Sequence, residues 1–526
     1  MTKRPSQYKE AFKKGLRQSS NPRNQDRLAR CSNAKPTREG LFGWKEIPQL
    51  VAQSLVAFPF PQLLAGREQI LLAYADQFYQ VDPISGTQTL LDTVDAYTGL
   101  SAFFDLSGGV WHFVDLGKMF ILVNGVGIVF RDNTTFDYSL NSPVKVATDV
   151  KLSSMCEWRG RIFSAGFMPS MTWKSGWQDI FAAYRSGERV PDDLRSMDFL
   201  IDENFVLWSS IGRADFSFRW LLYPDEAMSG ILSEIGGVSP LGYTGNKTPL
   251  QEALMRAELG MIRVPFKGQV LCVKPHSKGV IVYGTDGIAL LYHSQQPFST
   301  FGLKVLSFVG IAGRGAVGGS EDVHLFVDTT GKLCLLNSNA EITCLDYEEF
   351  FAPFLTKEIV VSYRADTLKP EFYISTETKS FVLTTGGLGE IWQSITSTGS
   401  FQGNQIVVSK NQQDRSLQVE TSDFDGGLTG ALKQAQSLRL SSNQSSGVLG
   451  SSAVSYQGGS FIYTRPRLFS PDGFLVLHDT GSLSRLCVSS DKAEGVILEQ
   501  LDVESDFLSK QIVRAAYGYE TEQQAD

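Results

Sequence analysis

The stretch KGVIVYGTDGIALLYHS, residues Lys278–Ser294, decides how the fold is interpreted. It contains two apolar runs, which are joined by the four residues Gly-Thr-Asp-Gly. Gly284 and Gly287 can take a positive φ at no steric cost, and a link of this kind favours a tight turn. The stretch therefore predicts a β-hairpin with a four-residue loop.

Other segments repeat this layout of two apolar runs around a short turn. They are Gln69–Asp82, Val110–Gly125, Met155–Phe167, Val323–Asn337 and Glu371–Thr385, with Asn204–Trp220 as a further candidate. Most of the segments begin about 40–50 residues apart, a spacing typical of a β-propeller built from short antiparallel strands. A single blade cannot cover both of its faces, so blades must pack on their neighbours. The sequence predicts an all-β protein whose main body is a six- or seven-bladed β-propeller.

The remaining segments are placed around this propeller. We expect a basic N-terminal arm at 1–45, the propeller at 46–435 with an insertion around 168–268, and a connection with a C-terminal β segment at 436–526. The connection, Ser441–Ser460, holds eight serines and four glycines, a composition typical of a loop. The strands after it either close the propeller or form a small separate β domain.

Three short helices are expected outside the strands. Ser6 is a candidate cap for a helix that ends near Gly15. Thr248–Gly260 begins with a capping residue and ends at a glycine, as short helices often do. Asp346–Leu355 is the third candidate.

Charge is distributed unevenly along the chain. The first 40 residues hold 11 of the 48 basic residues and three of the 56 acids, which leaves 37 basic and 53 acidic residues for the remainder. This split predicts an extended arm that becomes ordered against an acidic neighbour, and a body that does not bind nucleic acid through its general surface. A solvated basic tail is the alternative. The arm residues expected to contact the partner are Lys9, Lys13, Lys14, Arg17, Arg23, Arg27 and Arg30.

Six cysteines and five histidines are scattered along the chain without ligand spacing. A zinc site is therefore not expected, and the cysteines are predicted to be reduced and to act as small core residues. Reduced thiols fit a protein that folds in a reducing cytoplasm. No apolar run is long enough to span a membrane, and the N-terminus lacks the apolar core of a secretory signal.

Motifs that would carry chemistry are weak. GRGAVGG, Gly313–Gly319, has the spacing of a dinucleotide-binding turn, but a strand-like segment follows where a helix is needed, so we expect a turn-rich linker between blades. No calcium loop, nucleophile elbow or repeated sialidase box is present. We expect no enzyme and assign no catalytic, cofactor-binding or metal residue and no cofactor. The alternative is a catalytic pair of acids contributed by different blades. Trp158 and Trp173–Trp177 suit sugar stacking or an interface, although blade core is the favoured interpretation.

Three stretches resemble a known family. MCEWRGRIFSAGF (155–167) with VLWSSIGRADFSF (206–218), GQVLCVKPHSKGVIVYGTDGIALLY (268–292) and SFVGIAGRGAVGGSEDVHLFVDTTGKLCLL (307–336) are similar to segments of propeller-bearing tail proteins of tailed bacteriophages. That family comprises tail hub, nozzle and DNA-stabilisation proteins. The similarity covers residues 60–395. One departure is Arg213-Ala214-Asp215, where the family pattern has a proline after the tryptophan strand.

The resemblance implies a structural role in the virion. Such proteins form rings, commonly hexameric, below the portal and adaptor, contact other tail proteins and conduct DNA during ejection. The protein would then be assembled in the host cytoplasm and reside in the phage tail. An acidic lumen would let DNA slide, because no release of counterions rewards binding. The alternatives are a baseplate or minor tail protein of a long-tailed phage, and a receptor- or glycan-binding propeller that could hydrolyse envelope polymers.

Overall fold

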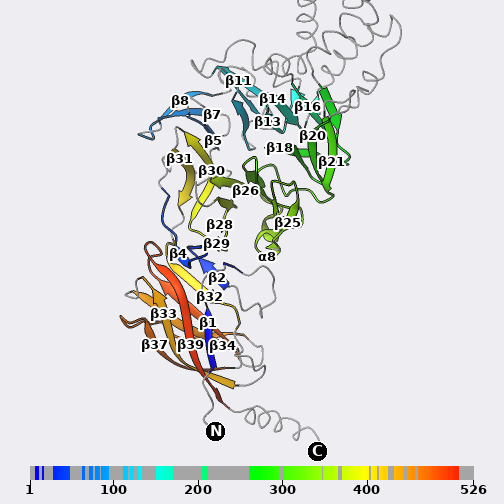
Figure 1. The fold of residues 1–526 in the computed structure, drawn as a ribbon. Helices are drawn as coiled ribbons and strands as arrows, with labels where there is room; N and C mark the ends of the chain where they lie inside the picture. The colour runs from blue at the N-terminus through cyan, green and yellow to red at the C-terminus, as the bar shows by residue number, and fades with distance from the viewer. Residues whose placement is uncertain are drawn as a thin grey trace, which may run out of the picture.

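The structure, a computed structural model, consists of two β bodies (Figure 1). The described residues are 6–10, 15–16, 28–47, 62–65, 70–74, 77–82, 85–93, 110–115, 119–123, 128–132, 150–166, 168–169, 204–209, 260–294, 301–345, 347–364, 370–401, 404–411, 414–423, 432–443, 447–455, 460–481 and 483–508. Within these ranges no helix is long and apolar enough to cross a bilayer.

The first body consists of antiparallel sheets that follow one another along the chain. Its strands are β5 (Gln62–Ala65), β6 (Ile70–Tyr74), β7 (Gln77–Val81), β8 (Gln88–Thr93), β9 (His112–Asp115), β10 (Met119–Val123), β11 (Ile128–Asp132), β12 (Val150–Lys151), β13 (Ser154–Trp158), β14 (Arg161–Ala165), β15 (Met168–Pro169), β16 (Phe205–Trp208), β17 (Gly260–Arg263), β18 (Val270–His276), β19 (Gly279–Gly284), β20 (Ile288–His293), β21 (Phe301–Ser307), β22 (Val317–Gly319), β23 (His324–Val327), β24 (Leu333–Leu336), β25 (Ile342–Cys344), β26 (Val360–Arg364), β27 (Glu371–Ser375), β28 (Ser380–Thr384), β29 (Gly387–Glu390), β30 (Gln393–Phe401) and β31 (Asn404–Asn411).

A shared axis makes this body a β-propeller. One cavity of about 340 Å³ is lined by residues of β5, β9, β13, β18, β22, β26 and β30, each the first strand of its sheet. Seven sheets of the described chain therefore surround one centre, and the seventh is the two-stranded β30–β31 hairpin. The prediction of an all-β propeller is confirmed.

Adjacent blades are held together by apolar packing between their faces. Phe301 is 1% exposed, and its ring lies 5.0 Å from that of Trp208 and 5.2 Å from that of Phe163. Trp158 joins the same cluster and donates its Nε1 hydrogen to the carbonyl of His276 at 2.8 Å. The blade-core interpretation of Trp158 is thus confirmed, whereas Trp173–Trp177 lies outside the described residues.

The ring is closed by strands from distant parts of the sequence. Ile406 and Val408 of β31 share an apolar cluster with Leu63 and Leu72 of the first blade. Leu63 also donates its backbone N–H to the hydroxyl of Ser397 in β30 at 2.9 Å. The last hairpin of the propeller therefore contacts the first blade directly.

The six segments predicted as hairpins all contain paired strands. They form β6–β7, β9–β10, β13–β14, β19–β20, β23–β24 and β27–β28. Of the candidate Asn204–Trp220, the structure describes residues 204–209, which form β16. In GRGAVGG the glycine turn leads into β22 rather than a helix.

The second body is built from both ends of the chain. Its strands are β1 (Ser6–Glu10), β2 (Leu28–Ser32), β3 (Ala34–Pro36), β4 (Leu41–Gly43), β32 (Leu417–Thr421), β33 (Leu432–Ser442), β34 (Val448–Ser455), β35 (Ile462–Tyr463), β36 (Arg467–Leu468), β37 (Phe474–Gly481), β38 (Leu483–Ser490) and β39 (Ile497–Leu508). One sheet has the order β3-β4-β39-β33-β37 with β1 on β39, and β32, β38 and β34 lie in the other. The C-terminal strands thus form a separate body and do not close the propeller.

Several local predictions are corrected here. The helix expected from Ser6 is instead β1, because its backbone pairs with the long strand β39 and tertiary pairing overrides local propensity. The loop expected at Ser441–Ser460 contains the end of β33 and all of β34. The propeller strands end at Asn411, and β32 already belongs to the second body, whereas the sequence predicted this boundary at 435.

The other two helix predictions have different outcomes. Asp346–Leu355 contains the helix α8 (Glu348–Phe351) and a 3₁₀ turn (Ala352–Phe354), so that prediction is confirmed. Thr248–Gly260 lies outside the described residues except for Gly260, which begins β17.

Two cysteines depart from the prediction of reduced thiols. Cys334 and Cys344 form a disulfide, because antiparallel pairing of β24 with β25 sets them directly opposite each other. Cys31, Cys156 and Cys272 are free and buried, as predicted for small core residues.

Candidate functional site

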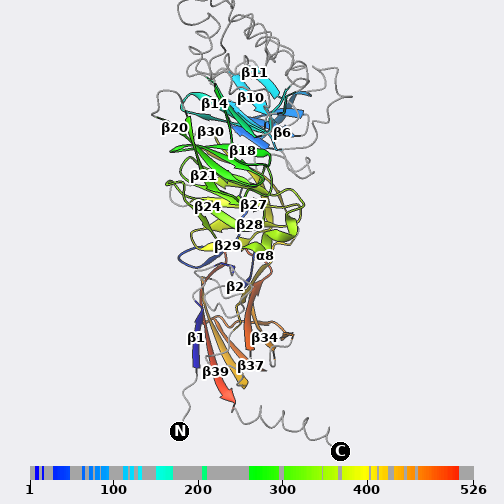
Figure 2. The same ribbon diagram turned by 90° about the vertical axis from the view of Figure 1, so that its right-hand side faces the viewer.

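Residues 28–43 connect the two bodies, as the side view shows (Figure 2). Strand β2 pairs antiparallel with β32 of the second body and touches β29 of the sixth blade in parallel at Ser32 and Glu390. One sheet therefore runs β26-β27-β28-β29-β2-β32-β38-β34-β35 without interruption. We call residues 28–43 the junction segment.

The apolar core is continuous across the junction segment. Leu28, Cys31, Ala34 and Leu41 lie in one buried cluster with residues of the propeller and of the second body. The propeller members include Leu333, Phe351 and Phe372, and the second-body members include Leu438, Val488 and Leu501. A shared core of this kind opposes independent motion of two bodies, because separating them would expose apolar surface to water.

Asn33 ties the junction segment to both sides. Its backbone N–H donates to the carbonyl of Glu390 at 2.7 Å, while its side-chain amide donates to the carbonyl of Ser416 at 2.6 Å. Its φ of 59° is in the left-handed region, which asparagine tolerates better than most residues. This residue type therefore suits both the turn and the two-sided hydrogen bonding.

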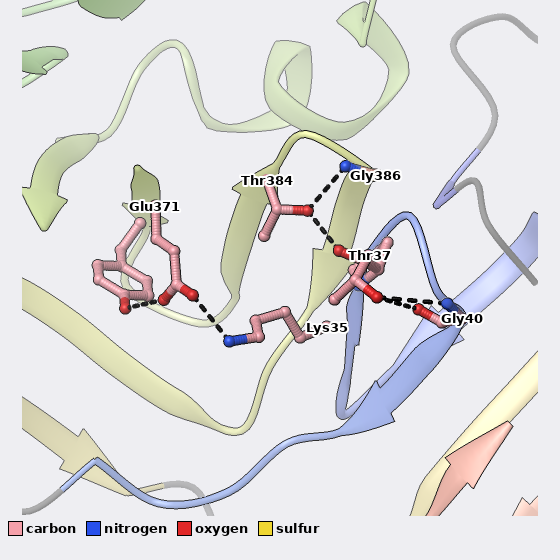
Figure 3. A network of polar contacts seen from close by, with 8 residues as sticks. Lys35, Thr37, Gly40, Glu371, Thr384 and Gly386 are labelled. Carbon is pink, nitrogen blue, oxygen red and sulfur yellow. Dashed lines mark hydrogen bonds and ion pairs between the residues drawn. The ribbon is translucent and has the colours of Figure 1, made fainter. Parts of the chain in front are cut away.

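A partly buried polar network includes Lys35 and Thr37 of the junction segment and Glu371 and Thr384 of the sixth blade (Figure 3). Lys35 Nζ is 2.7 Å from Glu371 Oε1, and the hydroxyl of Tyr373 donates to Glu371 Oε2 at 2.7 Å. Burial, followed by the neighbouring Glu371 charge, raises the pKa of Tyr373, so the phenol stays protonated as a donor. Thr384 donates its hydroxyl to the carbonyl of Pro36. The network bonds the junction segment to β27 and β28 of the sixth blade.

Glycines allow close approach of backbones where the junction segment contacts the two bodies; we call this contact the seam. A Cβ added at Gly389 would lie 2.2 Å from the carbonyl oxygen of Ala34, and one at Gly386 would lie 2.7 Å from the backbone of Pro36. At the other side of the segment, a Cβ at Gly43 would lie 1.7 Å from the carbonyl oxygen of Ala493. Glycine is needed at these positions for close approach rather than for flexibility.

The structure describes two of the seven predicted arm residues. Lys9 lies in β1, in register with Asp502 of β39, and Arg30 is exposed on β2 with its Nε 3.4 Å from the hydroxyl of Ser32. The other five lie outside the described residues: Lys13, Lys14, Arg17, Arg23 and Arg27.

The prediction of an extended arm that becomes ordered against a neighbour stays a prediction, but the described part of the arm is paired within the chain itself. Residues 28–43 are strands of the chain's own sheets, because their apolar side chains are buried between its two bodies. Sequence reasoning missed Asn33, Lys35 and Glu371, whose roles depend on contacts over more than 300 positions. The signal that could have indicated the seam is the Gly386-Gly387-Leu388-Gly389 run, since clustered glycines suggest close backbone approach.

Exposed apolar side chains are concentrated on the last strands of the second body. Ile462, Tyr463, Leu468, Phe474 and Val476 are between 44% and 63% exposed and lie on β35, β36 and β37, where both sheets end. We call these five residues the apolar end face. Arginines accompany it on exposed positions: Arg439, Arg465 and Arg467.

Neither a protein-family model nor a curated protein matches the chain. Among solved structures, the WD40 domain of Pan2 from Neurospora crassa has a TM-score of 0.34 at 9% identity, covering 69% of this chain and 95% of that one. Hsv2 of Kluyveromyces marxianus has a TM-score of 0.31 at 7% identity, covering 68% and 92%. PorZ of Porphyromonas gingivalis has a TM-score of 0.32 at 9% identity, covering 70% and 36%. These scores are low, so the propeller assignment depends on the sheets and the axial cavity of this chain.

Proposed function

We propose that this protein is a structural subunit of a bacteriophage tail, a hub or nozzle component that forms a ring below the portal and adaptor. The observation that carries the proposal is the single sheet and single core that continue from the propeller into the second body. A subunit that must hold a fixed position in an assembly benefits from two bodies without a hinge. The segments that resemble tail hub and nozzle proteins support the same role, which needs no catalysis.

The apolar end face supports packing against a second copy of the chain. Exposed apolar side chains that gather on one part of a protein are typical of interaction sites. This face carries arginines, whereas the chain beyond its first 40 residues has 53 acids against 37 basic residues. A cationic apolar face on one subunit would therefore meet an acidic surface on the next, and such a heterologous contact gives a ring when the rotation between subunits closes.

The proposed contact with DNA is passage without retention. An acidic body gains no free energy from counterion release, so DNA can slide along it. Duplex DNA is expected not to be retained by the purified protein at roughly 0.15 M salt, where the Debye length is about 8 Å. Tight, salt-sensitive binding would contradict a conduit role.

Oligomer mass tests the proposed ring directly. Native mass spectrometry of the full chain should show a closed oligomer, and the double variant Leu468→Asp, Phe474→Asp should remain monomeric. Leu90→Asp is the matched control, because Leu90 is 51% exposed on β8 of the first blade, away from the end face. A double variant that assembles as the wild type does would contradict the assignment of this face. Adsorption of the purified protein to host cells would favour a receptor binder instead.

A further inference from the structure

We propose that the axial cavity of the propeller is a binding site for a small oxyanion such as phosphate. The cavity has a volume of about 340 Å³ and receives residues from all seven described blades. Its position at the centre of the ring fixes the lining side chains on rigid strands. The proposal is independent of the structural role in a tail.

The charged side chains of the cavity favour an anion. Lys274 of β18 and Arg314, just before β22, both line it, and Glu157 of β13 is the one carboxylate among the described lining residues. Burial lowers the pKa of Arg314 and the nearby Glu358 opposes that shift only in part; a guanidinium nevertheless stays charged at neutral pH, because its ordinary pKa is so high. The lining groups thus carry an excess of positive charge.

Two buried polar atoms on the cavity-lining residues have no partner. His112 is 7% exposed and Thr396 is 3% exposed, and neither His112 Nε2 nor Thr396 Oγ1 has a hydrogen-bond partner. Buried polar atoms are nearly always bonded to protein, water or ligand. His112 lies on β9 and Thr396 on β30, so the two atoms belong to different blades beside the same cavity.

The imidazole of His112 is neutral and can donate a hydrogen bond from Nε2. Burial, and after it the charges of Lys274 and Arg314, lower the pKa of His112 well below its usual value, so the ring is neutral. Ser154 Oγ lies 3.2 Å from Nδ1 and already accepts from the N–H of Val273 at 3.1 Å. When Ser154 donates to Nδ1, the proton of the neutral ring is on Nε2.

The cavity therefore combines two cationic side chains with two lining residues that each carry a buried, unpartnered polar atom. An oxyanion has several acceptor lone pairs on one small centre, and hydrogen bonds from charged donors to such groups are the strong ones. A metal cation would be repelled by Lys274 and Arg314 and would find a single carboxylate, Glu157. An oxyanion is the ligand chemistry that matches the set.

Calorimetric titration of the full chain with inorganic phosphate in a chloride buffer tests the proposal. The wild type should show saturable binding, and Lys274→Met should weaken it about tenfold, the effect of losing one charged hydrogen bond. Lys304→Met is the matched control, because Lys304 is exposed on β21, the outer strand of the same blade, and it should bind phosphate as the wild type does.

A second variant guards against misfolding. Thr396→Val keeps the shape of the side chain and removes the hydroxyl, so it should weaken phosphate binding while the melting temperature stays within a few degrees. Saturable binding of succinate with phosphate excluded would identify a carboxylate site and overturn the phosphate assignment. No saturable wild-type binding, or equal affinity in Lys274→Met and wild type, would overturn the proposal altogether.

Discussion

Replacing Gly389 by alanine should weaken the union of the two bodies. The added Cβ would lie 2.2 Å from the carbonyl oxygen of Ala34 and 2.9 Å from Cδ of Pro36. Contact between a methyl carbon and an oxygen needs more than 3 Å, so β3 must move by roughly an ångström, as overpacked backbones do. The nearest atom belongs to the backbone, which cannot swing away as a flexible side chain can.

The cost follows from these contacts. Overpacking typically costs about 1–3 kcal/mol, and displacement of Pro36 would also strain its hydrogen bond from Thr384, worth about 1 kcal/mol. We expect Gly389→Ala to lower the free energy of unfolding by about 2–4 kcal/mol in urea denaturation. Gly313→Ala is the control, because no atom lies within 4 Å of its added Cβ, and it should change stability by less than about 0.5 kcal/mol. Equal denaturation midpoints for the two variants would refute the close-packed seam.

Three further predictions concern named contacts. Asn33→Ala should lower the free energy of unfolding by about 2–3 kcal/mol, because it removes hydrogen bonds and places alanine in a left-handed backbone conformation. Asn33→Gly should lower it less, because glycine tolerates that φ. Equal losses for the two variants in denaturation would contradict a contribution from the backbone conformation. Glu371→Gln should lower stability by about 1 kcal/mol by leaving Lys35 without its carboxylate, whereas Glu377→Gln, in an exposed pair, should have almost no effect in the same assay. Burial, and after it His276, lowers the pKa of His324 to about 3, so below pH 6.5 the unfolded chain binds a proton that the folded chain does not. The free energy of unfolding should therefore fall as pH drops from 6.5 towards 3. His324→Gln should flatten this measured pH dependence, and an unchanged slope would contradict the assignment.

The parts of the fold that sequence could predict are the local ones. Hairpins such as Gly279–His293 can be predicted from sequence, because two apolar runs and a glycine turn lie within one short stretch. Their repetition along the chain was enough to predict the propeller. The two-stranded seventh blade was not recognised, since β30 and β31 are stabilised by packing against Leu63, over 300 residues earlier.

The second body and the junction segment could not be predicted in this way. Their pairings join Ser6 to Ser505 and Leu28 to Thr421, and no local periodicity reports a partner so distant in sequence. The high positive charge of the arm predicts that its lysines and arginines contact an acidic partner. Its described structure depends instead on sparse apolar residues such as Leu28 and Leu41, which are too few to signal a core by themselves.

The most direct test of the structural role is the copy number of this protein in purified virions, measured by quantitative mass spectrometry together with its cross-linked neighbours. The proposal predicts a fixed, small number of copies that matches a ring, with cross-links to proteins at the portal end of the tail. Absence from virions, or cross-links confined to host-surface molecules, would contradict it.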